Sequence, residues 1–331
     1  MPAKRPTLQD IADIVGVTKM TVSRYLRAPD SVAAATGEKI AAALESSGYI
    51  RNRVPAILSK SSSKTLGIII PSLSNQVFAD LVQGVETITA QHGYDTLIAH
   101  TGYSAEVEQD KIDMMLSYQV DGLILTESGH TARTLQMLKQ AAIPVVETME
   151  VPSSPVDMAV GLDHEQAGYD VVNRILASGK QHPVYLAARM DTRTVLRQQG
   201  YEKAMAEAGK TPVTVSTSEH SSFTLGSELL ARALANYPKT DAVFCTNDDV
   251  AIGVMLYCQQ NKLRIPDDLA VVGYNALNIG AAMTPPLTSV VTPRDKMGEQ
   301  AASLIMTVLQ GETPKETVIT LPHSLTSGRT L

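Results

Sequence analysis

The residues best suited to chemistry lie near the start of the chain, in the segment from Gly16 to Arg24. Lys19 and Arg24 carry cationic donors on a segment that also holds Met20 and small polar side chains, and a helix needs such a mixed face to lie in a DNA major groove. Small hydroxyl side chains suit phosphate oxygens, which fix register without carrying sequence information. Four residues of this region carry such hydroxyls: Thr7, Thr18, Thr21 and Ser23.

These side chains need short helices to position them. Thr7 is a candidate N-cap with Asp10 three residues on, and Gly16 ends this first helix because glycine tolerates a left-handed turn. The apolar stripe of the first helix comprises Leu8, Ile11, Ala12 and Val15.

A second helix follows the turn, with Thr18 as its N-cap candidate. Its expected inward residues are Val22, Tyr25 and Leu26, and its expected outward residues are Lys19, Ser23 and Arg24. A third helix carries Ile40, Ala43 and Leu44 on one face and stops at Gly48. Ala33, at the start of this helix, has no capping hydroxyl, which makes the helix less stable by about 1 kcal/mol than one with a serine N-cap. Three short helices with the second exposed match helix-turn-helix geometry.

The charge distribution favours contact with phosphates. Residues 1–60 hold nine Lys and Arg against five Asp and Glu, a net charge of +4. The whole chain carries −6, so the remainder carries −10. A basic segment on an acidic body suits a domain that meets nucleic acid while the rest stays away from it. The plainer interpretations are helix capping alone for Thr18 and a solvated surface position for Lys19.

Five short motifs stand out in this segment: LQDIA at residues 8–12, GVT at 16–18, TVSR at 21–24, GYI at 48–50 and NRV at 52–54. Together they closely resemble the headpiece of the lactose-repressor (LacI) family, and the resemblance continues through nearly the whole chain. The segments most similar to gluconate operon repressors and their idonate-responsive relatives are residues 17–24, 71–73 and 245–249. The resemblance implies that Lys19 and Met20 occupy the family's main base-reading positions and that Arg24 is the third.

The segment after the third helix aligns with the family hinge, a short helix that folds on operator DNA. The resemblance makes Asn52 and Arg53 DNA contacts and places Leu58 where a leucine wedges a base step, which costs on the order of a few kcal/mol of unstacking. A helix this short is not stable alone, so its order should depend on DNA. Arg51 and Pro55 depart from the commonest hinge pattern, and Pro55 is tolerable only near the helix start.

Beyond a polar linker, apolar runs alternate with helical patterns. The expected strands are residues 66–70, 96–99, 122–125, 144–146, 184–187, 242–245 and 269–273, and two of the expected helices are 78–92 and 250–261. Such alternation predicts parallel sheets covered on both faces, and roughly 270 residues favour two lobes. The resemblance likewise implies a two-lobed α/β core of the periplasmic-binding-protein kind.

We therefore expect an all-α helix-turn-helix headpiece followed by this α/β core. The expected divisions are a headpiece at residues 1–49, a hinge helix and linker at 50–63, a first core lobe at 64–163 with 293–321, and a second core lobe at 164–292 with 322–331. Three crossings near Asp163, Thr292 and Leu321 are expected to join the two lobes.

Ligands of parallel sheets bind beyond the carboxyl ends of the strands, which in a two-lobed core means the cleft. Arg189 and Arg193 flank a strand-to-helix turn, and Arg197 lies one helical turn later. Clustered guanidinium groups suit a carboxylate, which they bind bidentately. By resemblance, Arg197 matches the family's effector-gripping arginine and Phe223 matches an aromatic that closes over the effector. For the arginines the alternative is a solvated, salt-bridged helix face.

Further effector contacts are expected from six residues: Asn75, Phe78, Glu147, Asn247, Asp248 and Asn275. Asn247 and Asp248 end a strand and suit ligand hydroxyl groups. Asn275 replaces an aspartate of many sugar-responding relatives, which lowers the negative charge around an anion. Glu147 is either exposed or a pocket acceptor, and we expect the pocket. The set fits a polyhydroxy acid such as gluconate, with other sugar acids and phosphate esters left open.

Signals for an enzyme are weak. The sequence has no phosphate loop, no Gly-x-Gly-x-x-Gly after a strand, no His-Glu-x-x-His and no Gly-x-Ser-x-Gly. No cofactor is expected. No metal site is expected either, because the adjacent side chains of Asp248 and Asp249 diverge and cannot hold one ion together. Cys245 and Cys258 are too few for a disulfide framework and imply a reduced compartment. No apolar run reaches membrane-spanning length and no signal-peptide core is present, so we expect a cytoplasmic protein.

These expectations combine into a repressor hypothesis. A homodimer places two headpieces on a pseudo-palindromic double-stranded operator, and effector in the cleft favours a closed core that separates the hinges. Because the chain ends at Leu331 without a leucine-heptad tail, a dimer is expected and not a tetramer. One alternative is a LacI-type regulator of another sugar or sugar phosphate. The other is a sugar-acid binding protein without regulatory output, which would need a signal peptide and a dispensable N-terminus.

Overall fold

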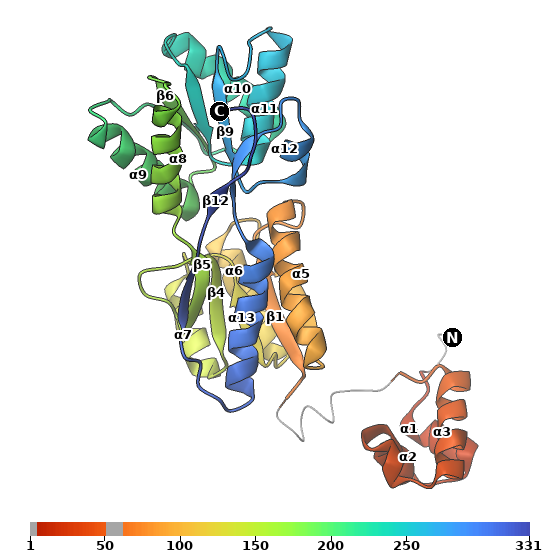
Figure 1. Ribbon diagram of the computed structural model, residues 1–331. Coiled ribbons are helices and arrows are strands. Elements are labelled where there is room, and N and C mark those ends of the chain that lie inside the picture. Colours follow the sequence, from red (N-terminus) through yellow and green to blue (C-terminus); the bar gives the residue numbers. More distant parts are fainter. Residues whose placement is uncertain (1–4, 51–61) are drawn as a thin grey trace. The chain divides into compact units, whose positions relative to one another are not determined.

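The computed structural model describes residues 5–50 and 62–331 (Figure 1). The chain divides into two compact units, Met1–Ser61 and Ser62–Leu331. None of the helices within the described ranges combines the length and the hydropathy that a bilayer crossing requires.

The first unit packs three α-helices of residues 5–50 around a small apolar core. They are α1 (Leu8–Val15), α2 (Lys19–Arg27) and α3 (Ala34–Ser47), with a 3-10 turn at Pro29–Ser31. Thr7 caps α1 in a reciprocal capping box with Asp10, and Gly16 turns the chain with φ of 73°. The predicted helices are confirmed, including the inward position of Val22. Helix α3 begins after Ala33 without a side-chain cap.

The first lobe of the second unit contains a parallel six-stranded sheet in the order β11-β5-β4-β3-β1-β2. Its strands are β1 (Thr65–Ile70), β2 (Asp95–His100), β3 (Gly122–Leu125), β4 (Val145–Glu150), β5 (Met158–Leu162) and β11 (Val318–Leu321). Helices α5 (Gln76–Gln91) and α13 (Arg294–Leu309) cover one face, and α6 (Ala105–Ser117) and α7 (Ala132–Ala141) cover the other.

The second lobe contains a six-stranded sheet in the order β12-β10-β9-β8-β6-β7. Its strands are β6 (Pro183–Ala188), β7 (Thr214–Thr217), β8 (Ala242–Cys245), β9 (Ala270–Tyr274), β10 (Thr288–Val291) and β12 (Ser324–Leu325). Its helices are α8 (His164–Ala177), α9 (Thr192–Glu207), α10 (Phe223–Asn236), α11 (Asp248–Gln260) and α12 (Asn278–Ala282). Helices α8 and α9 cover one face, and α10 and α11 cover the other.

The seven expected strands are present, but five others escaped the sequence analysis: β5, β7, β10, β11 and β12. The sheets are parallel as expected apart from β12, which pairs antiparallel with β10 at one edge. The α/β two-lobed core is thus confirmed, with an antiparallel edge strand that its apolar pattern did not predict.

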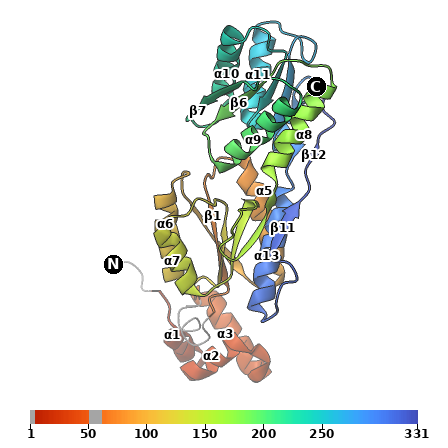
Figure 2. The ribbon, with the colours of Figure 1, turned by 90° about the vertical axis from the view of Figure 1, so that its left-hand side faces the viewer.

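Three segments pass between the lobes, and they follow β5, β10 and β11 (Figure 2). In the first sheet β1 lies between β2 and β3, and in the second sheet β6 lies between β7 and β8. Strand order reverses at these points, which opens a crevice at the carboxyl ends of the strands. The topology therefore directs two sets of strand-end loops toward a cleft between the lobes.

Helices on the sheets approach one another closely at glycines. These glycines are Gly84 with Gly298 in α5 and α13, Gly168 with Gly200 in α8 and α9, and Gly226 with Gly253 in α10 and α11. A Cβ atom at Gly200 would lie 2.0 Å from the backbone oxygen of Glu165. A side chain at such a contact would force the two helices apart.

Candidate DNA-reading helix and ligand cleft

Helix α2 presents Lys19, Met20 and Arg24 to solvent. Its start is fixed by Thr18, whose hydroxyl accepts a hydrogen bond from the backbone N–H of Thr21 at 3.2 Å. The Met20 side chain is 65% exposed. On this face the exposed methionine lies beside exposed basic residues, where a partner can reach it.

The hydroxyl residues of this unit are largely engaged with their own helices. Thr7 donates to the carboxylate of Asp10 at 2.7 Å, and the hydroxyls of Thr18 and Thr21 are 3.0 Å apart. Ser23 accepts from Arg27 at 3.5 Å. Arg27 is an exposed cation on the same helix that the sequence analysis did not single out.

The hinge contacts Asn52, Arg53 and Leu58 lie outside the described residues. They stay predictions.

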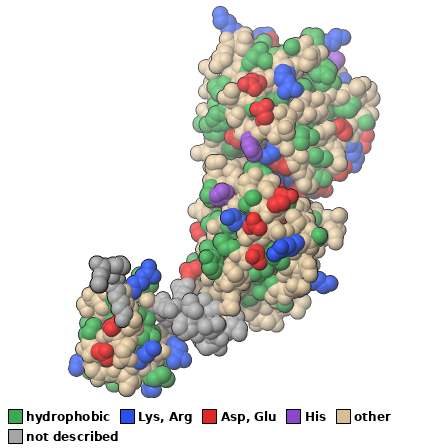
Figure 3. Space-filling model, turned by 180° about the vertical axis from the view of Figure 1, so that it is seen from behind, with side chains coloured by type: hydrophobic (Ala, Val, Ile, Leu, Met, Phe, Trp, Pro, Cys, Tyr) green, Lys and Arg blue, Asp and Glu red, His purple; other side chains and the backbone are tan. Residues whose placement is uncertain are grey.

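A cavity of about 630 Å³ lies between the two core lobes, within the range typical of small-molecule sites. The first lobe contributes loops that follow β1 and β2, and the second contributes loops that follow β6, β7 and β8. Charged and histidine side chains gather where the lobes meet (Figure 3). Of the expected effector residues, the cavity lining includes Asn75, Arg189 and Phe223.

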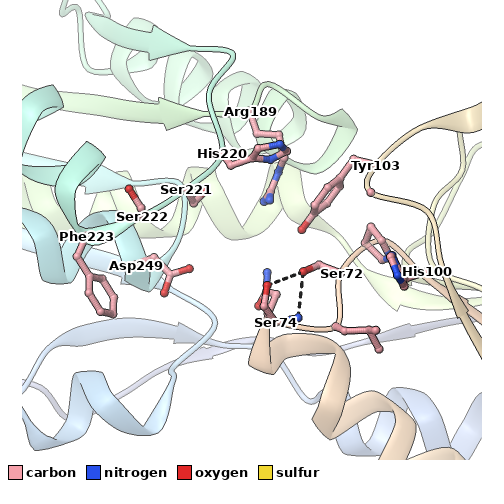
Figure 4. A pocket seen from close by; sticks show the side chains of 14 residues that line it. Ser72, Ser74, His100, Tyr103, Arg189, His220, Ser221, Ser222, Phe223 and Asp249 are labelled. Atoms are coloured by element: carbon pink, nitrogen blue, oxygen red, sulfur yellow. Dashed lines mark hydrogen bonds between the residues drawn. The ribbon is translucent and has the colours of Figure 1, made fainter.

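Arg189 is the cation of the cavity wall. Its guanidinium carbon lies 4.1 Å from the centre of the Tyr103 ring, and its Nε donates to Asp191 at 3.0 Å. Burial alone would raise the pKa of the Asp191 carboxyl, but the surrounding arginines hold that pKa well below its usual range. Figure 4 shows Arg189 and His220 from the second lobe facing Tyr103 from the first.

Both Arg189 and Tyr103 have left-handed backbone conformations, with φ of 68° and 67°. Residues with large side chains rarely adopt this conformation, and those that do cluster at ligand-binding and active sites. These two residues, one from each lobe, face each other across the cavity.

Further polar groups line the cavity beside apolar residues such as Phe223. Asp249 points into it (Figure 4), and burial raises the pKa of this carboxyl while Arg189 opposes the shift. Ser72 and Ser74 line the first-lobe side, with their hydroxyls 3.1 Å apart. Ser221 lines the opposite side. These acceptors and hydroxyls can hydrogen-bond the hydroxyl groups of a ligand.

Two of the three expected arginines are committed to protein acceptors. Arg193 donates to the backbone oxygen of Thr126 at 2.6 Å and to Glu127 at 2.5 Å, which joins the second lobe to the first. Arg197 donates to the backbone oxygen of Thr246 at 2.6 Å and lies over the Tyr274 ring at 3.9 Å. Both arginines are buried, and neither is among the residues that line the cavity.

Five further expected contacts also lie away from the cavity lining. Phe78 is buried in the apolar core beneath α5. Glu147 accepts from the backbone N–H of Val156 at 2.6 Å, inside the first lobe. Asn247 caps α11 and does not line the cavity, but its side-chain amide donates a hydrogen bond to the lining residue Ser221 at 2.7 Å.

Asp248 is bonded inside the second lobe, whereas Asn275 links this lobe to Arg294 at the start of first-lobe helix α13. Asp248 accepts from Ser289 at 2.6 Å and from the backbone N–H of Leu277 at 2.5 Å. Burial raises the pKa of this carboxyl to about 7. The backbone oxygen of Asn275 accepts a hydrogen bond from Arg294. Neither Asp248 nor Asn275 is among the residues that line the cavity.

Several residues that line the cavity were not predicted from the sequence, although they share one sequence feature. Tyr103, His220 and Asp249 each follow the carboxyl end of a strand, as the expected residues do. Asp248 and Asp249 are adjacent in α11, so their side chains diverge, and only Asp249 lines the cavity. Within the described ranges no cluster of three His, Cys, Asp or Glu side chains is arranged to hold a metal.

Sequence comparison places the two units with known families. Residues 7–52 match the profile of bacterial regulatory proteins of the lacI family. Residues 63–327 match the profile of periplasmic binding proteins and the sugar binding domain of the LacI family.

Individual relatives agree with these profiles. The chain is 48% identical to the HTH-type transcriptional regulator GntR of Escherichia coli (strain K12), and 43% identical to IdnR of the same strain, over 99% of each chain. The structure matches the crystal structure of a LacI family transcriptional regulator from Silicibacter pomeroyi with a TM-score of 0.92 at 30% identity. That match covers 98% of this chain and 99% of the other.

Proposed function

Because the chain belongs to the LacI family of bacterial regulators, we propose that it represses sugar-acid utilisation genes of the gluconate type. A sugar acid bound between the core lobes releases the protein from its operator. The relatives GntR and IdnR are transcriptional regulators, not enzymes. The observation that carries the ligand class is Arg189 on the cleft wall beside groups that bind hydroxyls.

The proposed ligand pose follows from the lining. Arg189 binds the ligand carboxylate, because a guanidinium fork matches two carboxylate oxygens. Asp249 and Ser221 bind hydroxyl groups of the polyol chain, and Phe223, which is 40% exposed, covers one side of it. Arg193 and Arg197 act indirectly, since their hydrogen bonds hold the strand-end loops in place.

The proposed DNA-bound form is a homodimer in the cytoplasm on a pseudo-palindromic operator. Residues 1–49 read the DNA, residues 50–63 form the hinge, and residues 64–163 with 293–321 and 164–292 with 322–331 form the lobes. Lys19, Met20 and Arg24 lie on the exposed face of α2, where helix-turn-helix proteins contact base edges. The ligand weakens operator binding only by as much as it prefers the released state over the bound state.

DNA binding is tested by mobility shift with palindromic sites upstream of sugar-acid genes. The unmodified protein should shift such a site, and Lys19→Ala should lose about 1–3 kcal/mol of base discrimination. Lys39→Ala removes an exposed lysine from α3 and should leave the shift unchanged. A protein that shifts none of these sites would refute the proposal.

Ligand class is tested by thermal unfolding with gluconate, idonate, ketogluconates, sugar phosphates and neutral sugars. The sugar acids should raise the unfolding midpoint, and Arg189→Gln should abolish that response. Arg264→Gln removes an arginine from a surface ion pair of the same lobe and should preserve it. An equal response to acids and neutral sugars would exclude the carboxylate role of Arg189, and a response to phosphates alone would assign a sugar phosphate.

A further inference from the structure

The second lobe has another cavity, of about 510 Å³, which we call the distal cavity. It lies at the amino-terminal edge of the sheet, beside the segments that lead into β6, β7 and β8. His182 precedes β6 and lines the distal cavity, whereas Arg189 follows β6 and lines the cleft. A six-residue strand of roughly 20 Å therefore separates the two sites.

The floor of the distal cavity is apolar. Val184 and Met205 are buried beneath it, and Val213 lines it from the segment before β7. Tyr237 and Pro238 lie at its rim, where α10 ends. The Tyr237 side chain is 42% exposed, so a flat ring surface remains open to a ligand.

The charged groups of the distal cavity are all basic. Lys210, Lys239 and His182 line it, and no Asp or Glu is among its lining residues in the described part of the chain. The Lys210 ammonium is held by the backbone and side-chain oxygens of Gln181, at 3.0 and 2.8 Å. The neighbouring carboxylate of Asp241 already accepts from the backbone N–H groups of Gln181 and His182, at 2.6 and 2.7 Å.

This arrangement is unusual for its surroundings. Residues beyond the first sixty carry a net charge of −10, so a cavity whose acid–base side chains are two lysines and a histidine, without a carboxylate, is a local reversal of the charge. Cations around an apolar floor complement a ligand that has one anionic end and one apolar end. A polyhydroxy acid fits poorly, because its hydroxyls would lose hydrogen bonds to water over the apolar floor.

We propose that the distal cavity is a second ligand site, which takes a small amphipathic anion such as an aromatic carboxylate. The ring packs against Tyr237 and Met205, and the anionic group lies near Lys239 and Lys210. The ligand differs in chemistry from the polyol acid proposed for the cleft, so the two ligands do not compete for one site.

The proposal is tested on the full chain with anilinonaphthalene sulfonate, a fluorescent aromatic anion. Saturable binding to one site per chain is expected, and excess gluconate should not displace the probe. Phenylacetate and benzoate should compete with it. Absence of saturable binding, or displacement of the probe by gluconate, would overturn the proposal.

Variants locate the bound probe. Lys239→Glu and Tyr237→Ala change exposed residues, and each should weaken probe binding by about tenfold or more with an unchanged unfolding midpoint. Lys262→Glu places the same charge change on an exposed lysine elsewhere in the second lobe and should have no effect. Equal binding by all these proteins would place the probe elsewhere and refute the assignment.

A blocking experiment needs no comparison between variants. Thr211→Cys puts a thiol at the exposed rim of the distal cavity, and the two native cysteines are buried. Labelling this thiol with a bulky maleimide should abolish probe binding, while the unlabelled variant still binds. Undiminished binding after complete labelling would contradict the proposed site.

Discussion

His130 lies between two carboxylates inside the first lobe. Its Nδ1 is 2.7 Å from Glu108, and its Nε2 is 3.3 Å from Glu147. Burial by itself lowers the pKa of His130, but the two glutamates outweigh burial and raise the pKa to about 9. An imidazolium between buried carboxylates is therefore part of the folded first lobe at neutral pH.

The pH dependence of stability follows from this shift. The pKa of His130 is higher in the folded state than the ordinary value of 6.5, so its stabilisation is complete below pH 6.5 and is lost as pH rises through 9. His130→Gln should remove on the order of 2 kcal/mol at pH 6 and much less at pH 10. Urea unfolding at several pH values measures the difference.

Subtracting the variant from the unmodified protein cancels other groups that titrate in this range, such as Asp248. His92→Gln, at an exposed position after α5, is the control and should show no such pH trend. A constant difference between the unmodified protein and His130→Gln from pH 6 to 10 would mean that folding does not raise the pKa of His130.

The sequence alone does not distinguish which of the three arginines reaches the cavity. Arg189, Arg193 and Arg197 share one turn and the start of one helix, so their spacing predicts a common role. The structure gives Arg193 and Arg197 internal acceptors and leaves Arg189 at the cavity. The acceptors belong to segments far away in the chain, and residue spacing carries no information about them.

Among the secondary-structure elements, the contact of α8 with α9 depends on glycine. A Cβ at Gly200 would meet the Glu165 backbone oxygen at 2.0 Å, a distance that no rotamer change can relieve. Gly200→Ala should therefore lower the free energy of unfolding by about 1–3 kcal/mol. Denaturant unfolding measures this change, and Gly129→Ala is a matched control because its Cβ would meet nothing within 4 Å. A neutral Gly200→Ala would show that the helices shift freely.

Element prediction succeeded where one physical signal dominates. Central strands such as β1 and β8 are apolar and buried. Helix α1 has both a side-chain cap and a glycine stop, α2 has a side-chain cap, and α3 has a glycine stop. The edge strands β7 and β11 are half-exposed, so their apolar pattern is weak. In β10, Thr288 and Ser289 are buried although both are polar: the backbone N–H of Thr288 donates to Thr330, and the Ser289 hydroxyl donates to Asp248. A hydropathy pattern does not distinguish such a strand from a loop.

For the whole core, the ion pair of Arg193 with Glu127 connects one lobe to the other. Glu127→Gln removes its charge and should disfavour the conformation in which the lobes touch. We expect the ligand to bind that conformation, so the free energy of ligand binding should weaken by about 1 kcal/mol, which raises the dissociation constant roughly fivefold. Calorimetric titration with the ligand identified by thermal unfolding measures the change.

Asp268→Asn is the control, because it breaks an ion pair with Arg264 inside a single lobe and should leave affinity unchanged. Equal ligand affinity in Glu127→Gln and the unmodified protein would show that the interlobe ion pair contributes nothing to ligand binding.

The three passages between the lobes also impose an order on biosynthesis. Helix α13 packs against α5 and β4, yet it follows every strand of the second sheet except β12. On the ribosome, the first lobe must therefore wait on the order of ten seconds until α13 emerges, and until then only α5 covers that face of the sheet. The headpiece needs no later segment for its own core, so a nascent chain acquires a folded DNA-reading unit well before the unit that regulates it.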